Sequence, residues 1–423
     1  MDAPMHQNQQ VPQKGAMLAL IAAFLGWFFD GFEIGLFPVI ARPALRSLLA
    51  EGGEGAVGQW MGYITAAFLV GAAFGGAVFG WLGDKIGRVR SMSLSILTYS
   101  LFSAAGYFAD APWHLAACRF VSALGMGGEW ALGVALIMEV WPENKRPYLA
   151  GAIGTAANCG MLLIALIAKK IPVTPESWRW VFLVGAAPAV ITLLIRFFVP
   201  ESERWHQSRK DVQTGKMSHL EYPMAAIFSR ALRRKTVIGI ILSAVALIGT
   251  WGSVQWIPLW ADELAGPTNP GAKANAQLML TVGAVVGSLL APILCAKFSR
   301  RLGFFLLCAL SLAVCQLMFR LKPGLGETFF QLTILCGLIT AAFYGFFPLY
   351  LPEFFPTAVR ATGQGVAYNT GRFVAAFGAV LGGELVKLLG GYANAGAIIT
   401  LVYAVGMIVI WFAPETHGKP LPE

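Results

Sequence analysis

Long apolar segments recur along the whole chain of 423 residues. Each is about 20 residues long, the length that an α-helix needs to cross the hydrocarbon core of a bilayer. The segments are too long for buried strands and too evenly spaced for the cores of soluble domains. Because a backbone in lipid must satisfy its own hydrogen bonds, each segment is predicted to be a helix. The predicted spans are 17–40, 59–82, 91–109, 113–138, 148–168, 180–199, 236–260, 275–296, 303–321, 329–351, 363–386 and 392–413.

The composition supports a membrane protein over a soluble one. Hydrophobic residues make up 57% of the chain and charged residues 13%, whereas soluble domains carry about 25% charged residues. The net charge of +9 lies in short loops between spans, so it predicts no nucleic-acid partner. The six cysteines lie inside spans without CxxC spacing or neighbouring histidines. We therefore expect neither disulfide nor metal site, and no cofactor.

The distribution of Lys and Arg predicts the topology. A polar stretch at 200–235 separates a six-span bundle at 1–199 from a second at 236–423, and we interpret it as a cytoplasmic central loop. If both termini are cytoplasmic, twenty of the 31 Lys and Arg residues lie on that side and nine on the other. Cytoplasmic loops of membrane proteins carry this excess. The sequence thus predicts a multi-pass protein of the inner (plasma) membrane with both termini in the cytoplasm.

The two halves repeat each other. A Glu-x-x-Pro-x-x-x-Arg pattern runs from Glu139 to Arg146 after the fourth span, and again from Glu353 to Arg360 after the tenth. Pro-Glu follows the sixth span at 200–201 and the twelfth at 414–415. Both matches have the same offset. They predict parallel repeats, an arrangement in which two bundles flank a central substrate path.

The loop after the second span carries the sequence GWLGDKIGRVR at 80–90. Glycine allows a tight turn between helices, and Asp84 can pair with nearby cations or cap a helix. The equivalent loop at 292–300 has Ala296 where the first has Asp84, so an acid-dependent latch is expected in the first half only. The predicted gating residues are Gly80, Asp84, Lys85, Gly87, Arg88, Glu139, Arg146, Glu353 and Arg360.

Two acids in the first span are expensive to place in a membrane. Asp30 and Glu33 are three residues apart and share a helix face. Placing an Asp at the centre of a transmembrane helix costs about 2.5–3.5 kcal/mol on insertion scales. Arg119 in the fourth span is the natural partner of one of them. Four of the five histidines lie in loops or tails, and His114 stands at the edge of the fourth span, so any proton relay would use carboxylates. The predicted proton-coupling residues are Glu33, Asp30 and Arg119. The alternative is a structural hydrogen bond between helices.

A second arginine inside a span favours an anionic substrate. If Arg119 neutralises a carboxylate, Arg372 in the eleventh span is left to bind a ligand. Snorkelling of Arg372, or pairing with Glu384, is the alternative. The predicted substrate contacts are Arg372, Asn369, Gln255, Trp256, Trp27, Glu129 and Tyr344.

The motif at 80–88 resembles the loop signature of the major facilitator superfamily. The run from Arg119 through 127–130, and the two Glu-x-x-Pro-x-x-x-Arg patterns, are similar to those of its sialate:proton and aromatic-acid and metabolite:proton symporter families. This resemblance implies an all-α membrane protein with twelve transmembrane helices in two six-helix bundles. It further implies alternating access, proton-coupled uptake with Glu33 at the position of the family's first-helix acid, and a cavity lined by spans one, four, seven and ten.

The leading hypothesis is therefore a secondary active transporter for proton-coupled uptake of a small organic anion, such as a sialic-acid-like compound or an aromatic acid. The bilayer, protons and that anion are its expected partners, and it is expected to be a monomer. A sugar or polyol carrier using Gln255 and Asn369 is the alternative. A membrane receptor or a membrane-embedded enzyme belongs to a different class, and the chain offers no catalytic constellation for the latter.

Overall fold

The computed structural model describes residues 13–49, 53–171, 173–188, 190, 195, 198–266, 269 and 271–423. Their regular secondary structure is entirely helical. The first half contains α1 (Gln13–Leu49), α2 (Gly53–Ile86), α3 (Arg88–Ala105), α4 (Pro112–Val140), α5 (Arg146–Lys170) and α6 (Trp180–Gly185). The segment between the halves contains α8 (Glu203–Gln213) and α9 (Pro223–Ile227). The second half contains α10 (Arg233–Trp251), α11 (Ile257–Ala265), α12 (Ala272–Cys295), α13 (Arg300–Leu321), α14 (Glu327–Thr340), α15 (Ala342–Tyr350), α16 (Arg360–Asn369), α17 (Gly371–Leu388), α18 (Tyr392–Ile399) and α19 (Val402–Val409).

Within the described part of the chain, nine helical segments are long and apolar enough to cross a membrane. The other three predicted spans correspond to α3, to the α6 region and to α16 with α17. Helix α3 is rich in serines and begins with two arginines, and its serines are mostly buried against the protein. Helix α17 carries Arg372, Glu384 and Lys387. Much of the predicted span at 180–199, with Arg196, lies outside the described residues.

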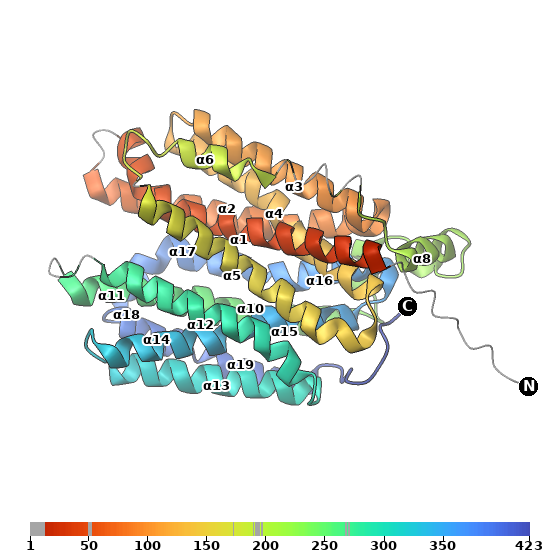
Figure 1. Cartoon of the computed structure of the whole chain (residues 1–423). Coiled ribbons are helices and arrows are strands. Elements are labelled where there is room, and N and C mark those ends of the chain that lie inside the picture. Colours follow the sequence, from red (N-terminus) through yellow and green to blue (C-terminus); the bar gives the residue numbers. More distant parts are fainter. Residues whose placement is uncertain are drawn as a thin grey trace, which may run out of the picture.

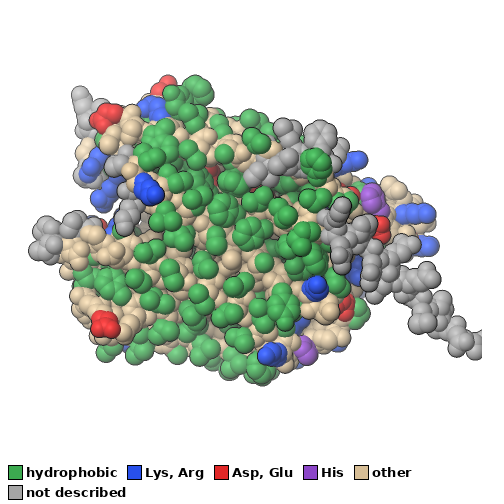
Figure 2. Space-filling model, viewed as in Figure 1, with side chains coloured by type: hydrophobic (Ala, Val, Ile, Leu, Met, Phe, Trp, Pro, Cys, Tyr) green, Lys and Arg blue, Asp and Glu red, His purple; other side chains and the backbone are tan. Residues whose placement is uncertain are grey.

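The two halves pack side by side as two layers of nearly parallel helices (Figure 1). Helices α1–α6 form one layer and α10–α19 the other, with α5 and α12 adjacent where they meet. The C-terminus and the described start of α1 lie at the same end as α8. Hydrophobic side chains cover the middle of the face in Figure 2, whereas charged side chains gather toward its two ends. This pattern fits a protein surrounded by lipid.

Several predicted spans are interrupted helices. The span at 236–260 breaks between α10 and α11 at Gly252 and Ser253, and Pro258 lies in the first turn of α11. The tenth span breaks between α14 and α15, and the eleventh at Thr370 between α16 and α17. The predicted loop at 200–235 is partly helical, since Ser202 caps α8 by accepting from the Trp205 amide at 3.2 Å. Backbone breaks at membrane depth occur where helices line a cavity or lie within protein.

The halves touch closely at the end of the molecule that carries α8. Helix α2 packs there against α16, and α4 also contacts α16. A Cβ at Gly80 would lie 2.6 Å from the Ala361 carbonyl oxygen, so only glycine permits this approach. The predicted requirement for glycine in this loop thus has a specific steric cause. This end of the molecule, which the charge pattern assigns to the cytoplasm, is closed.

Candidate functional site

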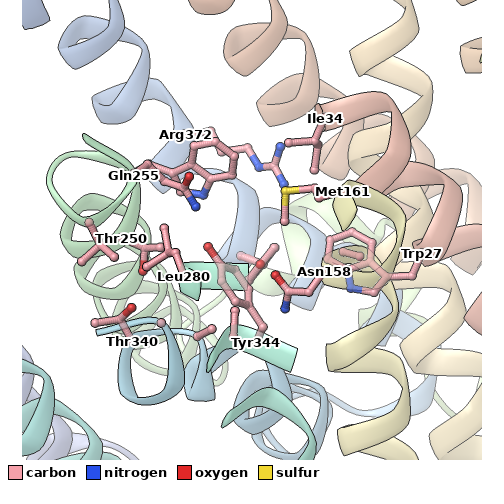
Figure 3. A pocket seen from close by; sticks show the side chains of 17 residues that line it. Trp27, Ile34, Asn158, Met161, Thr250, Gln255, Leu280, Thr340, Tyr344 and Arg372 are labelled. Carbon is pink, nitrogen blue, oxygen red and sulfur yellow. The ribbon is translucent and has the colours of Figure 1, made fainter. Parts of the chain in front are cut away.

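A cavity lies between the two halves, with about 560 Å³ of free space including its opening to solvent. Helices α1 and α5 of the first half line it, together with α10, α12, α14, α15, α16 and α17 of the second half and the connection after α10. Its walls are mostly apolar, and a few polar groups converge on it, which is typical of small-molecule sites. In Figure 3 the Arg372 guanidinium extends toward Ile34 and Met161 of the first half, and Asn158 and Tyr344 lie close together below it.

Four of the predicted substrate contacts line this cavity: Arg372, Gln255, Trp27 and Tyr344. Asn369, Trp256 and Glu129 are not among its described lining residues. The Asn369 amide instead donates to the carbonyls of Gly127 and Gly365, both at 3.0 Å. It therefore joins the halves.

Sequence reasoning missed several lining residues, and α4, one of the four expected cavity helices, supplies no lining residue. The polar or aromatic lining residues that were not predicted are Asn158, Thr250, Trp251, Thr340 and Tyr368. They lie on α5, α14, α16 and the end of α10, where the two bundles press together in this closed arrangement. Helix α4 lies just behind the cavity, since Trp130 stacks on Tyr368 at 4.0 Å between ring centroids. No motif marked these positions, because lining depends on helix rotation.

Arg372 is a buried cation that faces the cavity. Its side chain is 6% exposed, and its Nε has no hydrogen-bond partner among the described residues. Glu384, the alternative partner considered from sequence, is exposed and lies three turns away on α17. Snorkelling to solvent does not describe a guanidinium buried in this way. A cation with unused donor capacity in a cavity can bind an anion.

Glu33 and Arg119 form an ion pair inside the first half, as the sequence predicted. Arg119 Nη1 donates to Glu33 Oε1, and Arg119 Nη2 donates to the Glu33 carbonyl at 3.2 Å. Ser103 and Ser122 also donate to the Glu33 carboxylate, at 2.9 and 3.0 Å. The Arg119 guanidinium carbon lies 4.4 Å from the centroid of the Phe68 ring. The Glu33 carboxylate is thus well supplied with donors.

Asp30 has a different environment although it lies one turn away. It is fully buried, as is Glu129 of α4 apart from 2% of its surface. None of their four carboxyl oxygens has a hydrogen-bond donor among the described residues. The Glu129 carboxyl lies against α1 at Gly26, one turn before Asp30, so the two buried acids are close neighbours. The sequence predicted Glu129 as a substrate contact and did not pair it with Asp30.

Asp84 joins the two halves at the closed end. Its carboxylate accepts from the backbone amides of Ala361 and Thr362 at 3.2 and 2.8 Å, and from the Thr362 hydroxyl at 2.5 Å. These amides belong to the first turn of α16 in the other half. A carboxylate at a helix N-terminus satisfies free amides and is favoured by the helix dipole. Asp84 therefore caps a helix of the opposite bundle.

Three more predicted gating residues form a chain of ion pairs beside Asp84. Arg88 donates to Asp84 at 2.6 Å and to Glu139 at 2.9 Å, and also to the Thr357 carbonyl of the second half at 2.7 Å. Glu139 accepts a further bond from Arg360 of the second half at 3.0 Å. These side chains are fully shielded from solvent. One continuous buried network thus links α2 and α4 to α16.

The remaining gating residues are arranged differently. Glu353 accepts two bonds from Arg300 of its own half, at 3.1 and 2.9 Å. Arg146 donates to Glu143 at 2.9 Å, and its Nε and Nη2 have no partner among the described residues. The sequence predicted one set of gating residues, but Arg146 pairs with Glu143, and it is Arg360 that pairs with Glu139. Lys85 lies 5.5 Å from the ring centroid of Tyr222, and Gly87 has a φ of 112°.

Glu201 and Glu415 cap equivalent helices of the two halves. Glu201 accepts from the Arg88 and Val89 amides at the start of α3, and Glu415 from the Arg300 and Arg301 amides at the start of α13. Burial raises the pKa of Glu201 above its ordinary value, against the influence of Arg88 and these amides. Burial acts in the same direction on Glu415, but hydrogen bonds from backbone amides outweigh it and lower that pKa.

Comparison with known proteins decides the family. The profile described as Major Facilitator Superfamily matches residues 16–280, and that described as Sugar (and other) transporter matches residues 280–423. The chain belongs to the major facilitator superfamily. It is accordingly a multi-pass membrane transporter, and the superfamily is one of transporters rather than enzymes.

Relatives in this superfamily match along nearly their whole length. The inner membrane metabolite transport protein YgcS of Escherichia coli is 30% identical, over 85% of this chain and 84% of the relative. The cis,cis-muconate transport protein of Acinetobacter baylyi is 28% identical, over 98% and 99%. The sialic acid transporter NanX of Escherichia coli is 25% identical, over 93% and 92%.

Solved structures of the superfamily share the fold. The proton:xylose symporter XylE bound to 6-bromo-6-deoxy-D-glucose superposes with a TM-score of 0.80 at 19% identity, covering 97% of this chain and 98% of that one. The human organic anion transporter MFSD10 gives a TM-score of 0.72 at 14% identity, covering 93% and 99%. The predicted fold of twelve transmembrane helices in two bundles is thus confirmed.

Proposed function

We propose that this transporter carries a small organic anion into the cell together with a proton. The observation that carries the proposal is Arg372, a buried cation with an unpartnered Nε in the cavity between the halves. A buried cation is costly unless an opposite charge compensates it. A substrate carboxylate bound there would supply that charge, and the polar groups of Gln255 and Asn158 beside it would orient the rest of the molecule.

Relatives favour an organic acid as the substrate. Two of them are named as carriers of cis,cis-muconate and of sialic acid, both of which contain carboxylates. The aromatic groups Trp27, Trp251 and Tyr344 on the cavity wall suit an unsaturated or ring-containing acid. A sugar carrier is the second candidate, because the sugar-transporter profile matches residues 280–423 and a xylose symporter shares the fold.

A proton is the coupling ion that suits this chain. Three buried carboxyls lie within predicted spans of the first half, Asp30, Glu33 and Glu129, and acids at membrane depth are associated with proton pathways. Protonation of Glu33 would weaken its hold on Arg119, so that the arginine could move between the two access states. The sequence-based choice of Glu33 as carrier, with Asp30 second, remains a proposal.

A ligand panel tests the anion. Purified protein would be heated with cis,cis-muconate, sialic acid, nicotinate and xylose, and unfolding followed by intrinsic fluorescence. A ligand present at 100 times its Kd stabilises by about 2.7 kcal/mol. We expect an organic acid to raise the Tm of the wild type and of Arg320→Gln, an exposed control, but not of Arg372→Gln. Stabilisation by xylose alone would favour the sugar carrier, and an acid response that survives in Arg372→Gln would contradict the proposed site.

Proton coupling is tested in proteoliposomes that enclose a pH-sensitive dye. Adding the stabilising acid outside should acidify the interior of liposomes containing wild-type protein, because each anion enters with a proton. Liposomes with Arg372→Gln should show no such change. Uptake of radiolabelled acid without acidification would contradict symport with a proton.

A further inference from the structure

Asp30 and Glu129 are two buried acids whose carboxyl oxygens have no hydrogen-bond donor among the described residues. We propose that Asp30 and Glu129 share one proton, and that this pair is the proton site whose occupancy is linked to an anion bound at Arg372. The inference rests on the proposed function and deepens it. It assigns the proton to a pair within the first half, rather than to the Glu33–Arg119 ion pair.

A glycine on α1 makes room for the Glu129 side chain near Asp30. A Cβ on residue 26 of α1 would overlap the Glu129 carboxyl, so Gly26 leaves the space that this side chain occupies. The Glu129 side chain thereby enters the contact between α4 and α1 one turn before Asp30. Both side chains are almost wholly buried, and two ionised carboxylates in contact there would repel strongly. One proton between them turns this repulsion into a hydrogen bond.

Among the described residues, no cation pairs with Asp30 or Glu129. The charged groups that act on Asp30 are Glu129 of α4, Arg372 of α17 and Glu33 of α1. Tyr99 of α3 is also buried close to all three acids, and its hydroxyl has no partner among the described residues. Arg119, the nearby guanidinium of the first half, is engaged by Glu33. A proton is therefore the available positive charge for Asp30 and Glu129.

Glu33 contrasts with the pair in this respect. Four hydrogen bonds from Arg119, Ser103 and Ser122 hold its carboxylate and main-chain carbonyl. These donors satisfy the oxygens of Glu33, and its partner Arg119 already supplies a positive charge. Asp30 and Glu129 have no such donors to displace. The pair can therefore bind and release a proton without first breaking an ion pair.

Arg372 links the pair to the substrate cavity. It belongs to the second half, lines the cavity and acts electrostatically on Asp30. While Arg372 is uncompensated, its charge favours the ionised form of Asp30. A substrate carboxylate bound to Arg372 would cancel that effect, so the pair would hold its proton more tightly. By linkage the proton must strengthen anion binding by the same factor, which gives symport without direct contact between proton and substrate.

Infrared spectroscopy of the full-length protein in lipid nanodiscs tests this without a substrate. A protonated carboxylic acid has a carbonyl stretch that a carboxylate lacks, and titration with pH follows its loss. The wild type should show such a band near neutral pH, and Asp30→Asn/Glu129→Gln should lack it. Glu33→Gln should keep the band, as should Glu327→Gln, a control at an exposed position. In Arg372→Gln the band should persist to higher pH than in the wild type.

Each contrary result has a definite meaning. A wild type without the band, a band that survives in the double variant, or one that disappears in Glu33→Gln would overturn the shared-proton site. An unchanged titration in Arg372→Gln would overturn its link to the anion. The folding of each variant is checked by size-exclusion chromatography. As a second measurement, the Tm of the wild type should fall as the pH rises from the ordinary carboxyl range to the pH at which the band is lost, because the folded pair holds a proton that the unfolded chain has released, and it should level off above that pH. The Tm of Glu129→Gln should fall less over the same range.

Transport separates the failure of this inference from that of the proposed function. If wild-type proteoliposomes do not accumulate any acid of the panel under a pH gradient, the proposed function fails. If the wild type accumulates an acid and Asp30→Asn/Glu129→Gln does so equally, proton-coupled transport stands and the assignment to this pair is wrong.

Discussion

The two halves of the transporter repeat the same sequence patterns but build unequal latches at the closed end. In the first half, Asp84, Arg88 and Glu139 reach across to Thr362, Thr357 and Arg360 of the second half. In the second half, Ala296 replaces the aspartate, and Glu353 binds Arg300 of its own bundle. One loop therefore holds the bundles together, while its equivalent braces a single bundle.

The difference teaches that a repeated motif can have two mechanical roles. Under the alternating access that the resemblance implies, the halves separate at one end, so only bonds between halves resist opening. The bonds of Asp84 and Glu139 to the second half must break for the closed end to open, whereas the Glu353–Arg300 pair can persist throughout. Substitutions of Glu139 and Glu353 should then have unequal effects on the equilibrium between closed and open states. Substitutions of Glu201 and Glu415, which both cap a helix of their own half, should have similar effects on thermal stability.

The largest effect is expected for Asp84→Asn. The side chain of this variant lacks the negative charge of the carboxylate that accepts hydrogen bonds from the backbone amides of α16. Hydrogen bonds to charged groups contribute about 1.5–3 kcal/mol each. The closed state should lose at least tenfold in population relative to the open state, measured as the distance distribution between spin labels on α8 and α13. Asp110→Asn, a highly exposed control, should leave the distribution unchanged. An unaltered distribution in Asp84→Asn would mean that this residue does not hold the halves together.

Glu139→Gln and Glu353→Gln form a matched pair with the next largest difference. Removing the charge at Glu139 leaves the guanidinium groups of Arg88 and Arg360 without the negative charge that they share, and should favour opening by about 1–3 kcal/mol. Glu353→Gln should lower the Tm but not change the equilibrium between closed and open states. The same spin-label distances, with thermal unfolding, measure both quantities. Equal opening in the two variants would refute the asymmetry.

Ala296→Asp should give the loop of the second half a bond to the opposite bundle like the one that Asp84 makes. The repeat places residue 296 at the position equivalent to Asp84, next to the start of α5, where an acid can cap free amides for about 0.5–2 kcal/mol. We expect stabilisation of the closed state and uptake slowed several-fold, measured as initial rates in proteoliposomes. Ala296→Asn, which caps without a full charge, should slow uptake less. Faster uptake in Ala296→Asp would contradict a latch of this kind.

The smallest difference is expected between Glu201→Gln and Glu415→Gln. Each acid caps a helix of its own half by accepting backbone amides, and loss of a cap costs about 0.5–2 kcal/mol. Both variants should lower the Tm by a similar amount and leave the spin-label distances unchanged. A large change of distance in either variant would show that the cap also contributes to gating.

The sequence could predict the fold because its determinants are local. Span length, the Lys and Arg bias and the repeat at one offset each depend on neighbouring residues, and a first-span acid has few possible partners besides Arg119. The breaks at Ser253 and Thr370 were not predicted, because apolar composition alone does not reveal where a helix gives way to a cavity.

The candidate site was predictable in part. Arg372 stood out because a cation inside a span is rare, and the structure places it in the cavity. Asn158 and Tyr368 gave no signal, since an uncharged residue in a span lines a cavity only if its helix is rotated toward it. The exchange of Arg146 for Arg360 beside Glu139 could not be read from the repeat, because a symmetric motif does not say which copy crosses the interface.

The most direct test of the account is accumulation of an organic acid against its gradient. Proteoliposomes with equal concentrations of the panel's stabilising acid inside and outside would be given an acidic exterior. The account predicts net accumulation by the wild type, and none by Arg372→Gln or Asp30→Asn/Glu129→Gln. Exchange of labelled for unlabelled acid at equal pH should persist in the double acid variant. Accumulation that is independent of the pH gradient, or that survives the loss of Arg372, would contradict proton-coupled anion transport through this cavity.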